Sequence, residues 1–307
     1  MNKCFPPNII NPLKNIYNGK TILITGGGTG LGKSMGETYL KLGGNVVISS
    51  RKEEVLEKAK TEIMENNINL QNCGTIDYIK MDLRDHNSVL NLVNRMADEN
   101  RIPDIVINNA AANFLCPSEK LSYNGWNTIM DIVLKGTVDL TLEMGKKMIE
   151  MNKRGTFLSI STTYAETGSG FVLPSSIAKA GINNMTKSLS AEWGKYGIRL
   201  LGVAPGPIYT KGAFDRLDPT GNFQNKTYMK LPAGRMGEKE ELANLVSYLT
   251  SEQCSWLTGD IINFDGGEVV RNAGEFNSLI DLSKHEINEM LENSREKIGN
   301  KTHFSKL

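Results

Sequence analysis

The chain has 307 residues, of which 39% are hydrophobic and 22% charged, and its formal net charge is +1. This length can bury a full core, and the near-neutral charge gives no reason to expect binding to nucleic acid or acidic membranes. The four cysteines are scattered without a C-x-x-C pair and the three histidines lie far apart. We therefore expect reduced thiols, no disulfide framework and no metal site. No apolar run reaches the roughly 20 residues of a membrane span.

The two ends of the chain differ in what they indicate about targeting. The first twenty residues lack the features of a secretory signal and of an Arg-rich transit peptide. The chain finishes Ser305-Lys306-Leu307, the tripeptide that a peroxisomal import receptor reads at a free carboxyl terminus. We expect peroxisomal localisation through that receptor, with a tail that carries no signal as the alternative.

From Lys20 onward, short β-rich runs alternate with helix-length amphipathic segments. The expected strands are Thr21–Thr25, Asn45–Ser49, Thr75–Met81, Ile105–Asn108, Thr156–Ser161, Arg199–Ala204 and Ile261–Phe264. The expected helices cover residues 31–42, 52–66, 87–99, 123–151, 175–196 and 238–250. This alternation predicts a single-domain, Rossmann-like, doubly wound parallel sheet of the α/β class.

The predicted domain boundaries follow from this pattern. Residues 1–19 form an N-terminal extension, residues 20–268 the dinucleotide-binding catalytic domain, and residues 269–307 a C-terminal tail with a charged helical stretch near 284–297. Residues 206–236 follow a strand, are rich in Gly, Pro and Asp, and are too long for an ordinary connection. We expect them to form a substrate loop.

The run Thr25-Gly-Gly-Gly-Thr-Gly-Leu-Gly32 follows the first strand and opens a helix. Glycines at this spacing let the backbone turn tightly and approach a pyrophosphate, whose charge a helix amino end favours. The predicted cofactor contacts in this motif are Gly26, Thr29, Gly30, Leu31 and Gly32.

Residues after the next three strands refine the cofactor prediction. Arg51 stands where an NAD-specific site usually carries Asp or Glu, and its guanidinium can bind a 2′-phosphate, which predicts NADPH. The alternative is that Arg51 only begins a solvated helix face. Asp82 could accept from the adenine amine, and Asn109 lies near the adenine ribose. Further along, Pro205, Gly206, Pro207 and Ile208 form a rigid turn suited to the nicotinamide.

A reductase with a glycine-rich nucleotide loop usually carries the pattern Tyr-x-x-x-Lys further along its chain. That pattern is missing from the segment Tyr164-Ala-Glu-Thr-Gly-Ser-Gly-Phe-Val-Leu-Pro-Ser-Ser-Ile-Ala-Lys179. Ser175 takes the tyrosine position, one helical turn before Lys179, so the two side chains can share a helix face. Tyr164 must reach the site from a loop. Val133 stands where many such reductases place a relay asparagine. Both departures argue against ordinary ketone or alcohol chemistry.

Together with Ala-Glu-Trp-Gly-Lys-Tyr-Gly197, Lys-Gly-Ala-Phe-Asp-Arg-Leu-Asp-Pro-Thr-Gly221 and Phe-Asp-Gly-Gly-Glu268, these runs resemble the short-chain dehydrogenase/reductase superfamily. The finer resemblance is to its 2,4-dienoyl-CoA reductases, in the animal mitochondrial-type form, over roughly residues 12–282. It implies reduction of 2,4-dienoyl-CoA to 3-enoyl-CoA in unsaturated fatty acid β-oxidation. It also implies a homotetramer, and a mitochondrial location that conflicts with the terminal tripeptide.

The chemistry expected of such a site needs donors for a thioester oxygen. Hydride addition at Cδ of a dienoyl thioester leaves a dienolate, which fixed hydrogen-bond donors stabilise as in an oxyanion hole. We expect Tyr164 and Asn113 to be those donors and Lys179 to bind the nicotinamide ribose. Ser175 would bond the lysine, the cofactor or a water, or simply cap the long helix. The dienolate is then protonated at Cα by a donor that the sequence does not identify.

The resemblance assigns the acyl-CoA contacts to Arg84, Phe114, Ser122 and Arg216. Two alternatives stay open at this point. One is a 2-enoyl thioester or 3-ketoacyl reductase, and the other is a non-catalytic nucleotide-binding interaction protein on the same fold. Chain-length preference and double-bond geometry do not follow from the sequence.

Overall fold

The computed structural model describes residues 15–70, 73–212, 217–218 and 231–299. Its centre is one seven-stranded parallel sheet with the strand order β3-β2-β1-β4-β5-β6-β7. The strands are β1 (Thr21–Thr25), β2 (Asn45–Ser50), β3 (Ile76–Lys80), β4 (Ile105–Asn108), β5 (Gly155–Ile160), β6 (Ile198–Pro205) and β7 (Ile261–Phe264). The predicted fold class is therefore confirmed. Because all the strands run parallel, their carboxyl ends, after which the cofactor motifs stand, lie at one edge of the sheet.

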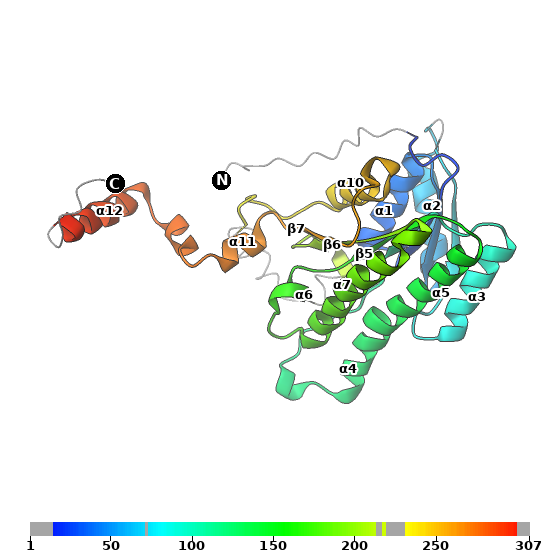
Figure 1. Ribbon diagram of the computed structural model, residues 1–307, viewed down its shortest axis with the longest axis horizontal. Helices are drawn as coiled ribbons and strands as arrows, with labels where there is room; N and C mark the ends of the chain where they lie inside the picture. Colours follow the sequence, from blue (N-terminus) through cyan, green and yellow to red (C-terminus); the bar gives the residue numbers. More distant parts are fainter. Residues whose placement is uncertain (1–14, 71–72, 213–216, 219–230, 300–307) are drawn as a thin grey trace.

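Helices cover both faces of the sheet (Figure 1). The α-helices of the described residues are α1 (Gly30–Lys41), α2 (Glu53–Asn66), α3 (His86–Asp98), α4 (Tyr123–Ile129), α5 (Gly136–Glu150), α6 (Tyr164–Thr167), α7 (Leu173–Trp193), α10 (Lys239–Thr250), α11 (Glu268–Ala273) and α12 (Lys284–Gly299). No helix among the described residues is both long and apolar enough to cross a membrane.

Alternate side chains of each central strand enter two different cores. Ile22 and Ile24 of β1 pack into the core that α1, α2 and α10 cover, whereas Leu23 between them enters the core under α3, α5 and α7. Strands that are buried on both faces read as continuous hydrophobic runs, because both side-chain directions are apolar. This pattern is why the strands were readable from sequence, and it makes the sheet a rigid platform for the strand-end loops.

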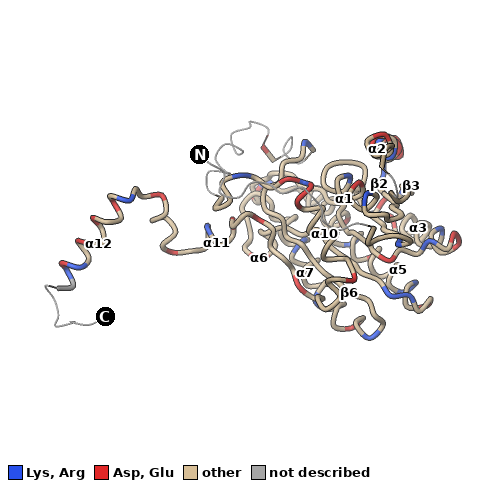
Figure 2. The backbone as a smooth tube through the Cα atoms, turned by 90° about the horizontal axis from the view of Figure 1, so that it is seen from above, with Lys and Arg blue, Asp and Glu red and all other residues tan. Residues whose placement is uncertain are grey.

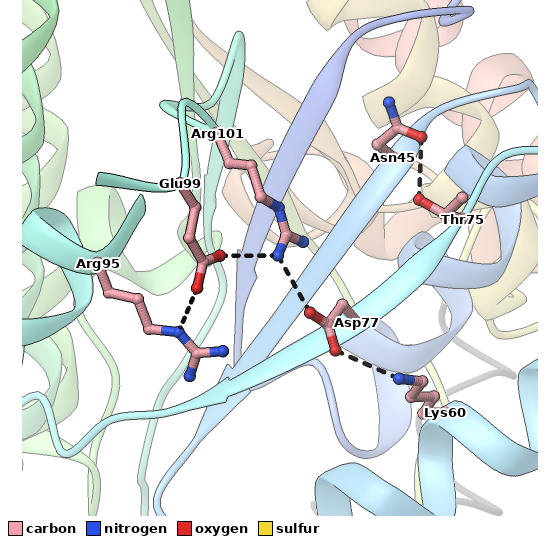
Figure 3. A network of polar contacts seen from close by, with 7 residues as sticks. All are labelled: Asn45, Lys60, Thr75, Asp77, Arg95, Glu99 and Arg101. Atoms are coloured by element: carbon pink, nitrogen blue, oxygen red, sulfur yellow. Dashed lines mark hydrogen bonds and ion pairs between the residues drawn. The ribbon is translucent and has the colours of Figure 1, made fainter. Parts of the chain in front are cut away.

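A surface network of charges ties α2, β3 and the end of α3 together (Figure 3). The Asp77 carboxylate on β3 accepts from Lys60 of α2 at 3.2 Å and from Arg101 at 3.1 Å. Arg101 also donates to Glu99, which accepts from Arg95 one turn earlier. Each pair contributes little alone, but the shared partners together hold β3, which ends two residues before Asp82.

The helix expected over residues 123–151 is not uniformly α-helical, and this prediction is corrected. A π-helical segment, Met130–Lys135, separates α4 from α5. Such segments occur frequently at functional sites because the extra residue rotates the side chains that follow. Nothing in the sequence periodicity signalled it.

After β7 the chain leaves the sheet in α11 and α12, and both views place α12 away from the main body (Figures 1 and 2). Acidic and basic residues are interspersed along α12 (Figure 2). The helix expected near 284–297 is present as α12, whereas α11 was not expected. The predicted domain boundaries themselves stay predictions.

Candidate active site

The loop between β1 and α1 brings its backbone close to any ligand at the sheet edge. Gly26 and Gly30 have φ of +66° and +54°, and a Cβ on Gly32 would lie 2.4 Å from the Gly26 carbonyl oxygen. The Asn109 amide donates to the Thr25 carbonyl at 2.9 Å and to the Gly26 carbonyl at 3.3 Å. Asn109 thus holds the loop from β4, a supporting contact that the sequence did not reveal.

The amino end of α1 offers this loop an electrostatic attraction for an anion. Thr29 is its N-cap residue, no side chain caps the helix, and its first turn carries no acidic residue. The first N–H groups of a 12-residue helix, with the positive end of its dipole, then remain for a ligand. Leu31 and Gly32 lie in this first turn. The cradle fits the pyrophosphate of a nicotinamide dinucleotide.

Charged residues follow β2 and β3, the two strands after which contacts to the adenosine part of the cofactor were predicted. Arg51 is exposed just after β2. The Arg84 Nε donates to both oxygens of the Asp82 carboxylate, at 3.0 and 3.2 Å, and hydrogen bonds from Arg84 lower the pKa of Asp82. Arg84 and Asp82 are thus paired with each other, and their predicted roles toward coenzyme A and the adenine stay predictions.

The turn after β6 is shaped by a close approach to β7. The Gly206 N–H donates to the Phe264 carbonyl at 3.0 Å, and a Cβ on Gly206 would lie 2.8 Å from the Asp265 Cα. Pro205 ends β6, Pro207 accepts from Gly237, and Ile208 is buried in a β-bridge to Gly237. The predicted nicotinamide turn is thus held rigidly at the same sheet edge as the glycine loop.

Three predicted catalytic side chains meet in one hydrogen-bonded group. The Asn113 amide donates to the Tyr164 hydroxyl at 3.1 Å, and the Ser175 hydroxyl lies 3.3 Å from the same oxygen. The side-chain oxygen Oδ1 of Asn113 accepts from the Phe114 N–H at 2.9 Å, which orients the side-chain nitrogen Nδ2 toward Tyr164. Two donors are therefore fixed beside one point, as an oxyanion site requires.

Two expectations about these side chains are corrected by the local structure. Tyr164 is the first residue of the one-turn helix α6, rather than part of an irregular loop. Ser175 does not cap the long helix, because α7 begins at Leu173 and Ser175 is 3% exposed inside its first turn. The Ser176 hydroxyl donates to the Tyr164 carbonyl at 2.9 Å. This bond links α6 to α7 beside the hydrogen bond between the Tyr164 and Ser175 hydroxyls.

Lys179 lies one turn beyond Ser175 on the buried face of α7 and is 7% exposed. Its ammonium donates to the Ile160 carbonyl at the end of β5. Burial lowers the pKa of Lys179 to about 8, because the charged form loses its hydration. An ammonium with two remaining donors in this position can bind ribose hydroxyls and stabilise negative charge beside Tyr164.

We expect Lys179→Met to change the pH dependence of stability in the cofactor-free protein. Below pH 8 the folded state bears the cost of a buried charge, while above 10.5 the lysine is neutral in both states. Wild-type stability should therefore rise relative to the variant between pH 8 and 10.5, by on the order of 3 kcal/mol. Urea unfolding of both proteins across this range measures the difference, and a constant difference would contradict the buried lysine.

The π-helical segment packs directly behind α7. Val133 is fully buried and forms a cluster with Ile129 and Ala178, the residue before Lys179. The position at which many reductases were expected to carry a relay asparagine is thus an apolar contact to α7, the helix that carries Ser175 and Lys179. Val133 packs against α7 through Ala178, and its hydrocarbon side chain cannot relay a proton.

Two of the predicted acyl-CoA residues, Phe114 and Ser122, lie beside the same glycine, Gly125, whereas Arg84 is paired with Asp82. Phe114 packs against the cluster around Val133, and its ring would meet a Cβ on Gly125 at 3.2 Å. The Ser122 hydroxyl oxygen accepts from the Gly125 N–H at 3.0 Å and caps α4. Arg216 lies outside the described residues. Their roles in binding coenzyme A stay predictions.

One residue near the site received no role from the sequence. Glu268, the first residue of α11, is half-buried and accepts from the Thr163 hydroxyl at 3.4 Å, next to Tyr164. Burial, and then the nearby Asp265 carboxylate, raise the pKa of Glu268. The motif that ends in Glu268 was visible in the sequence, but its contact with the residue before Tyr164 depends on how β5 and β7 lie in the sheet.

Comparisons with known proteins place this geometry in a family. The family model described as enoyl-(acyl carrier protein) reductase matches residues 26–268. A crystal structure of a short chain dehydrogenase from Bacillus anthracis is similar with a TM-score of 0.72 and 39% identity, over 81% of this chain and 96% of that one. The chain belongs to the short-chain dehydrogenase/reductase family. It is accordingly an oxidoreductase, and a nicotinamide dinucleotide is the cofactor that this fold implies.

Relatives of this reductase carry more specific names. A probable 2,4-dienoyl-CoA reductase [(3E)-enoyl-CoA-producing] of Caenorhabditis elegans is 42% identical, over 84% of this chain and 83% of the relative. A probable 2,4-dienoyl-CoA reductase [(2E)-enoyl-CoA-producing] of Bacillus subtilis is 36% identical, over 81% and 96%. A peroxisomal 2,4-dienoyl-CoA reductase [(3E)-enoyl-CoA-producing] of Danio rerio is 31% identical, over 87% of each. These relatives confirm the predicted resemblance to 2,4-dienoyl-CoA reductases, whereas the mitochondrial-type form stays a prediction.

Proposed function

We propose that this enzyme reduces 2,4-dienoyl-CoA to 3-enoyl-CoA with NADPH. The observation that carries the proposal is the group formed by Tyr164, Asn113 and Ser175, in which a serine replaces the acid of a carbonyl reductase and a tyrosine from α6 supplies a hydroxyl. Relatives named 2,4-dienoyl-CoA reductase support the same reaction.

The residues of the site suit each stage of that reaction. When bound, the nicotinamide supplies a hydride, which adds to Cδ of the conjugated thioester. Tyr164 and Asn113 donate hydrogen bonds to the thioester oxygen as it gains negative charge. Ser175 holds the Tyr164 hydroxyl in place, and the Lys179 ammonium stabilises the same charge. A proton that comes from solvent then adds to Cα, which leaves the remaining double bond between Cβ and Cγ.

The preference for NADPH over NADH is assigned to Arg51. We expect Arg51→Gln to weaken NADPH binding by about 10- to 100-fold, because a charge-assisted bond to the 2′-phosphate is lost, while NADH binding stays unchanged. Titration of protein fluorescence with both cofactors measures this. Lys52→Gln removes the adjacent charge and serves as the matched control; an equal loss in both variants would mean that Arg51 acts only through general attraction.

Two rival functions make different predictions. A 2-enoyl thioester reductase, the activity in the family model's description, and a 3-ketoacyl reductase would each consume their own substrate with NADPH. A non-catalytic nucleotide-binding protein would bind NADPH and turn over nothing. NADPH oxidation should therefore be followed with a 2,4-dienoyl-CoA, a 2-enoyl-CoA and a 3-ketoacyl-CoA in parallel. Turnover confined to the dienoyl substrate supports the proposal, and fast turnover of the ketoacyl substrate would overturn it.

The cellular setting is proposed from the relatives' names and the predicted signal. Relatives from Danio rerio, Rattus norvegicus and Arabidopsis thaliana are named peroxisomal, and we propose peroxisomal fatty acid β-oxidation, with mitochondria as the alternative. The tripeptide Ser305-Lys306-Leu307 lies outside the described residues, so its recognition by an import receptor stays a prediction. So does the homotetramer.

A further inference from the structure

Phe171, between α6 and α7, has a strained backbone. Its φ is +66°, in the left-handed region that bulky residues rarely adopt. The other non-glycine residues with positive φ in the described chain are Asn15, Asn100 and Asn152, and asparagine tolerates this conformation. Phe171 is therefore the one outlier for which the residue type itself offers no reason, and such strain persists where the surroundings enforce it.

The surroundings of Phe171 show what the strain achieves. The Cys116 N–H donates to the Phe171 carbonyl at 2.8 Å, which joins the segment after β4 to the segment before α7. The ring gains no burial in return, because Phe171 is 60% exposed whereas the next residue, Val172, is 6% exposed. The conformation thus holds an aromatic ring outside the core at a fixed place.

Two other apolar side chains are exposed on the same joined segments. Leu115, before Cys116, is 50% exposed, and Leu173, at the start of α7, is 39% exposed. With Phe171 we call them the apolar rim. Residues 113–117 and 168–176 contain no charged residue, so the rim suits hydrocarbon rather than a nucleotide phosphate.

The rim lies on the same two chain segments as Asn113 and Ser175 of the hydrogen-bonded group. Leu115 is two residues beyond Asn113, and Leu173 is two residues before Ser175, on the segments that supply those side chains. The arginines that suit nucleotide phosphates, Arg51 and Arg84, follow β2 and β3 instead. These strands lie on the opposite side of β1 from β4 and β5, which precede the rim segments.

We propose that Phe171 and Leu115 contact the acyl chain beyond Cδ and so determine which chain lengths this enzyme prefers. The inference rests on the proposed function, since it takes an acyl thioester held at Tyr164 and Asn113. The strained turn at Phe171 is the device that presents the ring to the chain.

The test is Phe171→Gly, which removes the ring and also relieves the backbone strain. We expect an unchanged or higher Tm, together with a loss of chain-length discrimination. The ratio of decanoyl-CoA to hexanoyl-CoA affinity, measured by calorimetry with NADP present, should fall at least tenfold. Each buried methylene contributes about fourfold in affinity, so this fall corresponds to lost contact with about two methylenes of the longer chain. The ratio of kcat/KM for 2,4-decadienoyl-CoA to 2,4-hexadienoyl-CoA should fall in parallel.

Two further variants make the result specific. Leu115→Ala should lower the same affinity ratio, and Phe276→Ala, which removes an exposed ring in the chain after α11, should leave it unchanged. An unchanged ratio in Phe171→Gly, or an equal loss at both lengths, would overturn the inference. So would a change in sedimentation, because the rim would then cover a second copy of the chain. If no dienoyl-CoA is turned over by the wild type, the proposed reaction fails, while the affinity ratio still decides the role of Phe171.

Discussion

Tyr164→Phe should lower kcat with a 2,4-dienoyl-CoA by about 10²–10³-fold, the usual effect of removing one oxyanion donor. The variant keeps the ring and its packing but loses the hydroxyl that lies 3.1 Å from the Asn113 amide and 3.3 Å from the Ser175 hydroxyl. Because the lost bond matters when charge develops on the thioester oxygen, KM should change much less than kcat. Steady-state kinetics over a range of substrate concentrations separates the two.

The control for this variant is Tyr123→Phe, which removes a hydroxyl from a tyrosine that is 82% exposed on α4. It should retain wild-type kcat. NADPH binding, measured by fluorescence, should be the same in both variants and in the wild type. A Tyr164→Phe enzyme with full turnover would show that another group stabilises the oxygen.

Gly32→Ala should abolish measurable cofactor binding and with it turnover. A methyl group there would lie 2.4 Å from the Gly26 carbonyl oxygen and 2.6 Å from the Asn109 amide nitrogen, so the glycine loop must shift. Overpacking of this kind costs about 1–3 kcal/mol of stability, and displacement of the loop removes the backbone approach that a pyrophosphate needs. Isothermal titration with NADPH and thermal unfolding measure the two effects.

A glycine in open surroundings provides the comparison. A Cβ on Gly194 meets nothing within 4 Å, and its φ is −54°, so Gly194→Ala should bind NADPH like the wild type. If Gly32→Ala lost stability but kept its affinity for NADPH, the loop between β1 and α1 would not be the pyrophosphate site.

The sequence predicted those parts of the fold that depend on local pattern. Strands buried on both faces, such as β1 and β4, are unbroken hydrophobic runs, and the helices between them have one apolar face. The shared helix face of Ser175 and Lys179 was likewise predictable from their spacing, and both are buried in α7. Helical spacing and strand alternation are intrinsic to the chain and need no tertiary information.

Other parts depended on contacts between distant segments. The α6 turn brings Tyr164 to Ser175 because the chain reverses through Gly168, whose φ is +72°, and Phe171. The π-helical segment arises where Val133 packs against α7, and periodicity does not encode it. The tertiary arrangement decides these features, and local pattern alone does not.

The measurement that tests the central claim most directly is the position of isotope in the product. NADPH deuterated at the transferred position should be incubated with the enzyme and a 2,4-dienoyl-CoA, and the product examined by NMR; a second reaction uses unlabelled NADPH in D₂O. We predict cofactor deuterium at Cδ only, solvent deuterium at Cα and a double bond between Cβ and Cγ. Cofactor deuterium at Cβ, or a product that keeps the double bond next to the thioester, would contradict the proposed reduction of 2,4-dienoyl-CoA to 3-enoyl-CoA.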